Sequence, residues 1–351
     1  MTKEELLNNI RLDNSIEQCN IEAIDLSGMD LSGVRFKDVN FRDIDFSSSK
    51  ILKTGFKNCS FYACSFDKVD FKELVWNKMR ALSCSFHDAD LSRATFNAMD
   101  FSKSDFTNAT MSQATFFESI FNEVHFQTTN CTKTTFSQTE MKHALFLDCD
   151  LLSTVFFKID IVGTKFVRTK MKKTVLMECT LQEQNFENST LNMVQFNSSD
   201  LNHSTFNGAN LTQTNFYKCN LSSCLFRGVQ APNTIFTQTN LTLADLSGAN
   251  LYQSNFSDAS LKLANFDSAN IEQTYFVSAK CQESNFAHVN AKYANFSYAS
   301  FDKTIFNDAN LSFALVHGVL SKDTNFKVAN CFGLRKTDPD LLEAENFKAF
   351  L

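Results

Sequence analysis

The side chains with the greatest capacity for chemistry in this chain of 351 residues are eleven cysteines and six histidines. Such residues bind zinc, or form a nucleophile and its base, when short spacings or the fold bring them together. The sequence contains no Cys-x-x-Cys pair, no combined Cys/His spacing and no glycine-rich phosphate loop. We therefore expect no enzyme, no metal site and no cofactor. The histidines are scattered, at His87, His125, His143, His203, His288 and His317.

A run of basic residues is the other local feature that could bind a ligand. Its members are Lys165, Arg168, Lys170, Lys172 and Lys173. A cluster of this kind can hold an anion or an acidic partner, but an ordinary solvated face explains it equally. The formal net charge is -6, and no basic stripe of the kind that binds phosphate backbones is present. We expect no direct nucleic-acid binding.

The elements that would position any site follow from one five-residue register. Every fifth residue from Ile16 to Cys331 gives 64 centres, of which 32 are Phe and 15 are Leu, and only Ser321 is polar. A helix repeats every 3.6 residues and a strand every two, so neither produces this period. The residue two before each centre is small in most repeats. The register predicts one buried side chain in every five residues, along nearly the whole chain.

All eleven cysteines fall either on a centre or on the small position two residues before one. We interpret them as small core residues of a protein from a reducing compartment. Cys64 and Cys84 occupy equivalent positions 20 residues apart, so a disulfide between them is geometrically possible.

Stretches such as ADLSGANLYQSNFSDASL, residues 244–261, resemble the pentapeptide-repeat family, whose pattern is A(D/N)LXX around a central Leu or Phe. The resemblance covers residues 16–331. It implies an all-β fold, a right-handed quadrilateral β-helix with four pentapeptides in each coil. About 16 coils at the strand spacing of about 4.8 Å would form a rod roughly 75 Å long.

The placement of phenylalanine supports a four-sided coil independently of the resemblance. In steps of 20 residues, Phe fills 14 of 15 centres from 46 to 326 and 12 of 14 centres from 36 to 296. The other two series are mostly aliphatic. Eight of the nine glycines lie two residues after a centre, where a corner requires positive φ. We expect two opposite faces to direct Phe inward.

The two ends of such a coil need closing, because they expose core side chains and unpaired strand edges. We expect an N-terminal helical cap over residues 1–15, a single β-helix over 16–335 and a C-terminal capping helix over 336–351. At the N-terminus, Thr2 and Glu5 have the spacing of a capping box.

At the C-terminus, Asp338 and Pro339 suit the start of a helix. One face of this helix would carry Leu341, Ala344, Phe347 and Leu351. The purely structural interpretation is that this face covers the last coil. The alternative, which the family resemblance implies, is that it forms a dimer.

Apolar residues at outward positions are the least expected feature of the repeats. Outward positions elsewhere are mostly Ser, Thr, Asn, Asp or Lys. A contiguous exposed apolar patch usually marks a contact surface, although single surface hydrophobes are also tolerated. The candidate interaction surface consists of Phe117, Val155, Phe157, Val175, Met177 and Tyr217.

The resemblance implies two functions for a chain without catalytic residues. One is a bacterial protein-interaction scaffold or adaptor, in some relatives associated with a secretion system, whose partner is another protein or a second copy of the chain. The other is a DNA mimic that binds a type II topoisomerase and confers quinolone resistance. Mimicry requires a long acidic face. Residues 201–330 carry eight acidic and eight basic side chains, so the scaffold is preferred.

The first 15 residues lack the basic segment and the apolar segment of a secretory signal. No run of about 18 apolar residues is present, so we expect no membrane insertion. A cytoplasmic location is expected, with signal-independent export as the alternative.

Overall fold

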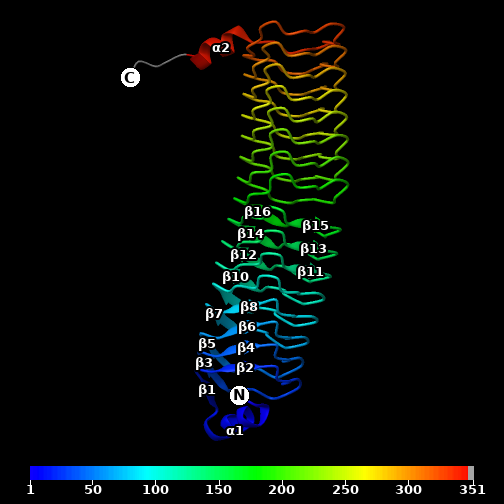
Figure 1. The fold of residues 1–351 in the computed structure, drawn as a ribbon. Helices are drawn as coiled ribbons and strands as arrows, with labels where there is room; N and C mark the ends of the chain where they lie inside the picture. Colours follow the sequence, from blue (N-terminus) through cyan, green and yellow to red (C-terminus); the bar gives the residue numbers. More distant parts are fainter. Residues whose placement is uncertain (347–351) are drawn as a thin grey trace, which may run out of the picture. The chain divides into compact units, whose positions relative to one another are not determined.

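The computed structural model describes residues 1–346, which fold as a parallel β-solenoid with two short helices (Figure 1). The chain divides into two compact units, Met1–Val175 and Leu176–Leu351. In each unit the backbone returns to the same face after 20 residues, so that residue i pairs with residue i + 20 in parallel register. This spacing confirms the coil of four pentapeptides.

The first unit starts with helix α1 (Lys3–Asp13) and continues in strands of three residues each. The strands are β1 (Ser15–Glu17), β2 (Asn20–Glu22), β3 (Arg35–Lys37), β4 (Asn40–Arg42), β5 (Gly55–Lys57), β6 (Ser60–Tyr62), β7 (Val75–Asn77), β8 (Arg80–Leu82), β9 (Thr95–Asn97), β10 (Thr115–Phe117), β11 (His125–Gln127), β12 (Thr135–Ser137), β13 (Leu145–Leu147), β14 (Val155–Phe157), β15 (Lys165–Val167) and β16 (Val175–Met177). Strand β16 crosses the boundary between the units.

These strands form parallel sheets in the orders β1-β3-β5, β2-β4-β6-β8, β7-β9-β10-β12-β14 and β11-β13-β15. A strand directs alternate side chains to opposite sides. The middle residue of each strand therefore points into the coil while its two neighbours face outward, as in β10, where Phe116 is fully buried and Phe117 is exposed.

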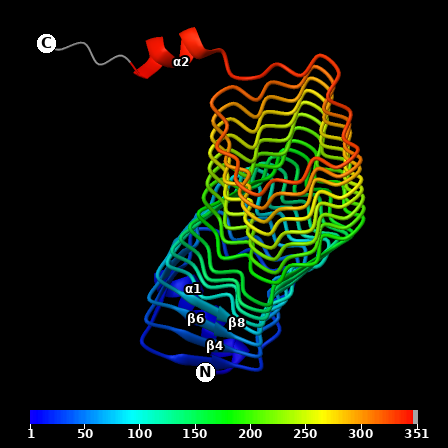
Figure 2. The same cartoon turned by 90° about the horizontal axis from the view of Figure 1, so that it is seen from above.

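The second unit repeats the same coil through single β-bridges and ends in helix α2 (Pro339–Asn346). Its coils lie one above another and trace a four-sided outline (Figure 2). One outward column carries a ladder of amides: the Asn270 amide donates to Asn250 at 3.1 Å and the Asn290 amide donates to Asn270 at 3.2 Å. The same side-chain oxygens accept backbone N–H groups two residues further on. The ladder ties successive coils together at their surface.

Stacked phenylalanine rings fill the interior. Phe146 lies between Phe126 and Phe166, with ring centroids 4.4 and 5.1 Å away and planes tilted by only 8° and 13°. From the opposite face Phe156 meets Phe146 edge to face, with centroids 5.9 Å apart. Stacked and edge-to-face pairs are both favourable for aromatic rings. The two inward Phe faces expected from the sequence are confirmed.

Polar side chains at the small inward positions form hydrogen bonds with the backbone, so they can be buried in a dry interior. The Thr134 hydroxyl donates to the Met111 carbonyl at 2.7 Å, and the Thr214 hydroxyl donates to the Leu191 carbonyl at 2.8 Å. Apart from the half-buried Cys19, the cysteines at these positions are buried, and burial raises the pKa of the Cys149 thiol to about 11. Cys331 is an exception to the expected burial: it is exposed because it belongs to the last coil.

The corners place one residue in five at positive φ, and side chains other than glycine adopt this conformation throughout. Even the β-branched Val328 has a φ of 59°. At two corners, glycine leaves room for an aromatic ring of the preceding coil. A Cβ added at Gly318 would lie 2.6 Å from Cδ1 of Tyr298, and one added at Gly333 would lie 2.7 Å from Cδ1 of Phe313.

The N-terminal coil is covered by α1. The predicted capping box is present: the Thr2 hydroxyl accepts the Glu5 N–H at 3.2 Å, and the Glu5 carboxylate accepts the Thr2 N–H at 2.8 Å. Leu6 on this helix is fully buried. Neither helix within residues 1–346 is long and apolar enough to cross a membrane.

Among residues 1–346, no element covers the last coil, in contrast to the first. Phe326 is 42% exposed and Phe332 is 72% exposed. Helix α2 buries none of its described side chains, and Leu341 is 47% exposed. Ala344 lies on the same exposed helix, while Phe347 and Leu351 fall outside the described residues. The described part of α2 therefore does not cover the coil.

Polar contacts attach α2 to the side of the second unit. The Glu345 carboxylate accepts the Tyr298 hydroxyl at 2.5 Å and lies 3.1 Å from Nε2 of His317. The Asp338 N–H donates to Nδ1 of His317 at 3.2 Å. These contacts bury His317, although its outward phase in the repeat predicts an exposed side chain.

The first prediction tests the phase of the core. Phe146→Ala removes a ring that is stacked on both sides, so the free energy of unfolding should fall by about 3–5 kcal/mol. Lys133→Ala, at an exposed corner, should change it by less than about 0.5 kcal/mol. Urea denaturation measures both. Equal losses would show that position 146 is not part of a packed column.

The second prediction concerns the attachment of α2. Hydrogen bonds from Tyr298 and His317 hold the pKa of the Glu345 carboxyl below its usual range. A depressed pKa means that the contribution to stability exists above the unfolded value, near 4.3, and is lost as the pH falls through the lower folded value. Backbone amides of residues 340–346 should therefore be protected from hydrogen exchange at pH 7. At pH 3 this protection, relative to the intrinsic exchange rate at the same pH, should be lost.

Glu345→Gln should abolish this protection at pH 7, because an amide replaces the charged acceptor of both hydrogen bonds. Glu343→Gln on the same helix is the matched control and should retain it. Equal protection in both variants would contradict the attachment.

Candidate interaction surface

The strands of the first unit hold four of the candidate residues at outward positions. Phe117 ends β10, while Val155 and Phe157 flank the buried Phe156 on β14. Phe117 is 37% exposed, whereas Val155, Phe157 and Val175 are half-buried. Their outward phase is as expected from the repeat. Together Phe117, Val155, Phe157 and Val175 are called the Phe117 face.

The register fixes the order of these side chains along the face. Phe117 is paired with Ser137, and Ser137 is paired with Phe157 on the next coil. Val155 is paired with Thr135, and the Val175 N–H donates to the Thr154 carbonyl at 2.8 Å, one coil further on. The Phe117 face is thus an apolar surface interrupted by small side chains.

Met177 and Tyr217, the other two candidates, belong to the second unit. Both are half-buried at outward positions. The Lys218 ammonium lies 5.1 Å from the centre of the Tyr217 ring, a cation–π distance. The sequence placed all six residues on one surface, but the geometry that the structure defines for the Phe117 face is that of the first unit alone.

Few charges lie beside the Phe117 face. Glu118 follows Phe117 at a corner, and the Lys158 ammonium lies 5.2 Å from the centre of the Phe157 ring. Lys133 and Lys173 lie at the corners that precede Thr135 and Val175, so basic residues outnumber Glu118 around the face within the first unit. The face offers apolar contact, and the basic residues beside it disfavour a cationic ligand.

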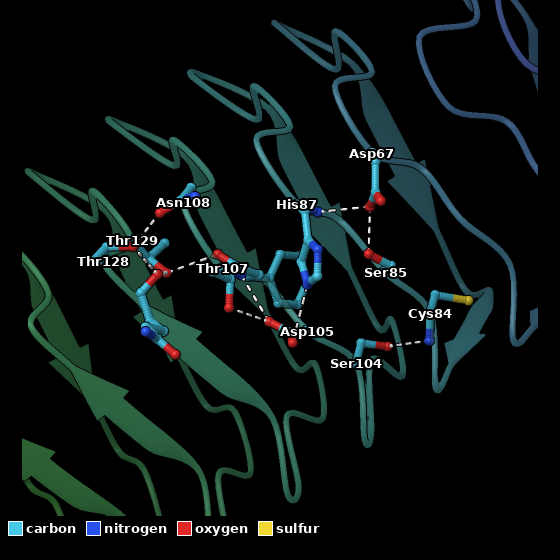
Figure 3. Close-up of polar contacts among 12 residues, drawn as sticks. Asp67, Cys84, Ser85, His87, Ser104, Asp105, Thr107, Asn108, Thr128 and Thr129 are labelled. Carbon is cyan, nitrogen blue, oxygen red and sulfur yellow. Dashed lines mark hydrogen bonds and ion pairs between the residues drawn. The ribbon is translucent and has the colours of Figure 1, made fainter.

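A polar cluster on another part of the first unit has the residue types of a catalytic triad (Figure 3). His87 lies 3.1 Å from Asp105 through Nε2, and its backbone N–H donates to Asp67 at 2.9 Å. The Ser85 hydroxyl donates to Asp67 and not to the imidazole. A nucleophilic serine needs the imidazole as its base. The cluster therefore ties neighbouring coils together and lacks the geometry of acyl transfer.

The pKa of Asp105 agrees with a structural role. Burial alone would raise the pKa of this carboxyl, but hydrogen bonds from Thr107 and His87 outweigh it and hold the pKa below the usual range. A general acid at neutral pH would need the opposite shift. Within residues 1–346, no three His, Cys, Asp or Glu side chains come together as a metal site.

The second unit carries exposed aromatic residues at corners, and these are not part of the candidate interaction surface. Tyr293 and Phe313 occupy consecutive corners and stack with centroids 5.2 Å apart. Beside them, a groove of about 360 Å³ is lined by Tyr275, Tyr293 and three amide side chains. Corner positions were interpreted only as turn residues. The signal that could have found them is a large side chain at the third position of a repeat.

Three pentapeptide-repeat family models match the chain, and between them they cover well over half of it. The model of the pentapeptide repeat region matches residues 144–216 and 199–276, the model of nine repeat copies matches 82–125, and the model of eight copies matches 16–47 and 284–320. No curated protein matches the chain with statistical significance.

Solved structures with a similar fold include two pentapeptide-repeat proteins. Trypsin-treated QnrB1, a plasmid-mediated fluoroquinolone resistance protein, is 18% identical, with a TM-score of 0.37, over 54% of this chain and 97% of its own. HetL of the cyanobacterium Nostoc, involved in regulating heterocyst differentiation, is 19% identical, with a TM-score of 0.22, over 77% of this chain and 90% of its own. Such distant similarity concerns the fold alone. The family models, which together match well over half of the chain, show that this chain belongs to the pentapeptide-repeat family.

Proposed function

We propose that this protein is a non-enzymatic interaction scaffold and that the Phe117 face is where a protein partner binds. The observation that carries the proposal is a group of outward apolar side chains, one exposed and three half-buried, on one face of a coil whose outward positions are otherwise mostly polar. Stacking of the inward residues does not require Phe117 or Phe157, because both point away from the core. Their presence outside is therefore not explained by folding.

The free energy gained by burying these apolar side chains is sufficient for an interface. Full burial of one large apolar side chain contributes about 1.5–3 kcal/mol. Interfaces concentrate their affinity in a few such side chains surrounded by a polar rim. Beside the Phe117 face, the corner residues Glu118 and Lys158 would supply part of that rim.

A second copy of the chain is the other partner that we consider. The open last coil and the exposed Leu341 of α2 favour self-association at the C-terminal end of the second unit. DNA mimicry is less well supported, because acidic residues here alternate with bases. Arg168 binds Asp148 at 2.6 Å, and Arg227 binds Asp245 at 2.5 Å, so neither carboxylate contributes to an acidic column.

The third prediction tests the Phe117 face. Phe157→Asp should leave the melting temperature within a few degrees of the native value, because the side chain lies outside the core. The substitution should abolish binding of the native partner, since it places a charge at the centre of an apolar contact. Gln127→Asp is the matched control: Gln127 also follows an inward Phe but lies exposed on a different sheet.

Light scattering on the wild-type protein and both variants first establishes the oligomeric state. If the wild type is monomeric, the partner is purified from the source cells and its affinity for each variant is measured by calorimetry. A folded Phe157→Asp protein with unchanged oligomeric state and unchanged affinity would overturn the proposal. Unfolding of this variant alone would show that Phe157 points inward.

A further inference from the structure

Strands β10, β12 and β14 carry a complete column of aromatic rings on their inner side and an incomplete one on their outer side. On the inner side Phe116, Phe136 and Phe156 form an unbroken stack, with centroids 5.1 and 5.3 Å apart and planes within 11° of parallel. The coil spacing of these three strands thus equals the distance at which aromatic rings stack.

On the outer side the same three strands carry Phe117, Ser137 and Phe157 in register. The middle ring of the column is missing. Two coil steps separate Phe117 from Phe157, which corresponds to roughly 10 Å. A planar group placed over Ser137 would therefore lie about 5 Å from each ring, the distance at which rings of the inner stack pack.

The residues around Ser137 favour one kind of planar group over another. Ser137 carries a small side chain, so no ring of this chain stands in register between Phe117 and Phe157, and Thr135 lies two residues before it on the same strand. The Lys158 ammonium already lies 5.2 Å from the Phe157 ring. A guanidinium group inserted beside that ring would meet a like charge, which is unfavourable at this distance. An uncharged aromatic ring meets no such penalty.

We propose that Phe117, Ser137 and Phe157 form an aromatic notch that receives one aromatic side chain of the protein partner. The inserted ring completes a second, outer stack of three. The notch rests on the proposed function of the Phe117 face and gives it a specificity: the partner must present an exposed tryptophan, tyrosine or phenylalanine. An aliphatic or cationic anchor would not be equivalent.

The test uses N-acetyltryptophanamide as the probe and the full-length protein with labelled Val and Thr methyl groups. Ring-current shifts of Val155 and Thr135 should saturate with a dissociation constant of the order of 1 mM, as expected for so small a ligand. N-acetylargininamide and N-acetylleucinamide should bind at least tenfold more weakly. Equal binding of either one would overturn the aromatic preference, and absence of a saturable shift with the tryptophan probe would overturn the notch.

Ser137→Phe is the decisive variant, because it fills the notch from within while adding apolar surface. This variant should retain the native melting temperature, and its affinity for the tryptophan probe should be at least tenfold lower. Ser257→Phe is the matched control, an equivalent outward serine of the second unit between Thr237 and Val277, and it should leave the affinity unchanged. Unaltered binding to Ser137→Phe would contradict the notch.

The same variants separate this inference from the proposed function. If Phe157→Asp abolishes binding of the native partner while Ser137→Phe does not, the Phe117 face is the docking surface but its contact is general apolar burial. Loss with both variants supports the notch. If Ser137→Phe should itself unfold, Ser137→Gln, which fills the space without a ring, provides the same comparison.

Discussion

The structure depends on the agreement between two distances. Parallel strands lie about 4.8 Å apart, and aromatic rings pack well at nearly the same separation. A coil that returns after 20 residues therefore places each Phe directly against its equivalent on the next coil, as Phe126, Phe146 and Phe166 do. An insertion of one or two residues would move every later side chain off its column. This constraint explains why the register continues without a break from Ile16 to Cys331.

The same constraint separates folding from function along the sequence. Inward positions are determined by stacking, and corner positions by the backbone turn. Outward strand positions remain largely free, so departures from their usual polar character carry most of the information about binding. Phe117 and Phe157 are such departures, and Ser137 between them gives the surface a shape as well as an apolar character. The polar contacts of Asp67, His87 and Asp105 show that outward residues can also serve only to tie coils together.

Most of the fold could be predicted because it repeats. The phase of Phe146, the capping box of Thr2 and Glu5 and the positive φ of Gly318 all follow from spacing within the sequence. The burial of His317 could not, because it depends on Glu345 and Asp338, which lie outside the repeats on or beside α2. The positive φ of Val328 follows from the same spacing as that of Gly318, although propensity argues against it at a β-branched residue. The division into two units leaves no break in the five-residue pattern.

The candidate surface was only partly predictable. The repeat places Phe117, Val155, Phe157 and Val175 outward, and the 20-residue coil is enough to set Ser137 between the two rings. The contact of Lys158 with Phe157, which distinguishes an aromatic guest from a cationic one, depends on the conformations of both side chains. The aromatic corner of Tyr293 and Phe313 was missed because large side chains were not expected in a turn.

Engineered disulfides measure the coil directly. Gln127 on β11 is paired with Leu147 on β13, so cysteines at these two positions lie at the spacing of neighbouring strands, within the range that a disulfide spans. In the full chain, the pair Gln127→Cys and Leu147→Cys should cross-link on mild oxidation, as detected by mass spectrometry of the joined peptides. The pair Gln127→Cys and Leu152→Cys, five residues further on, should not. Cross-linking of the second pair, or failure of the first in a folded protein, would contradict the 20-residue coil on which the whole account rests.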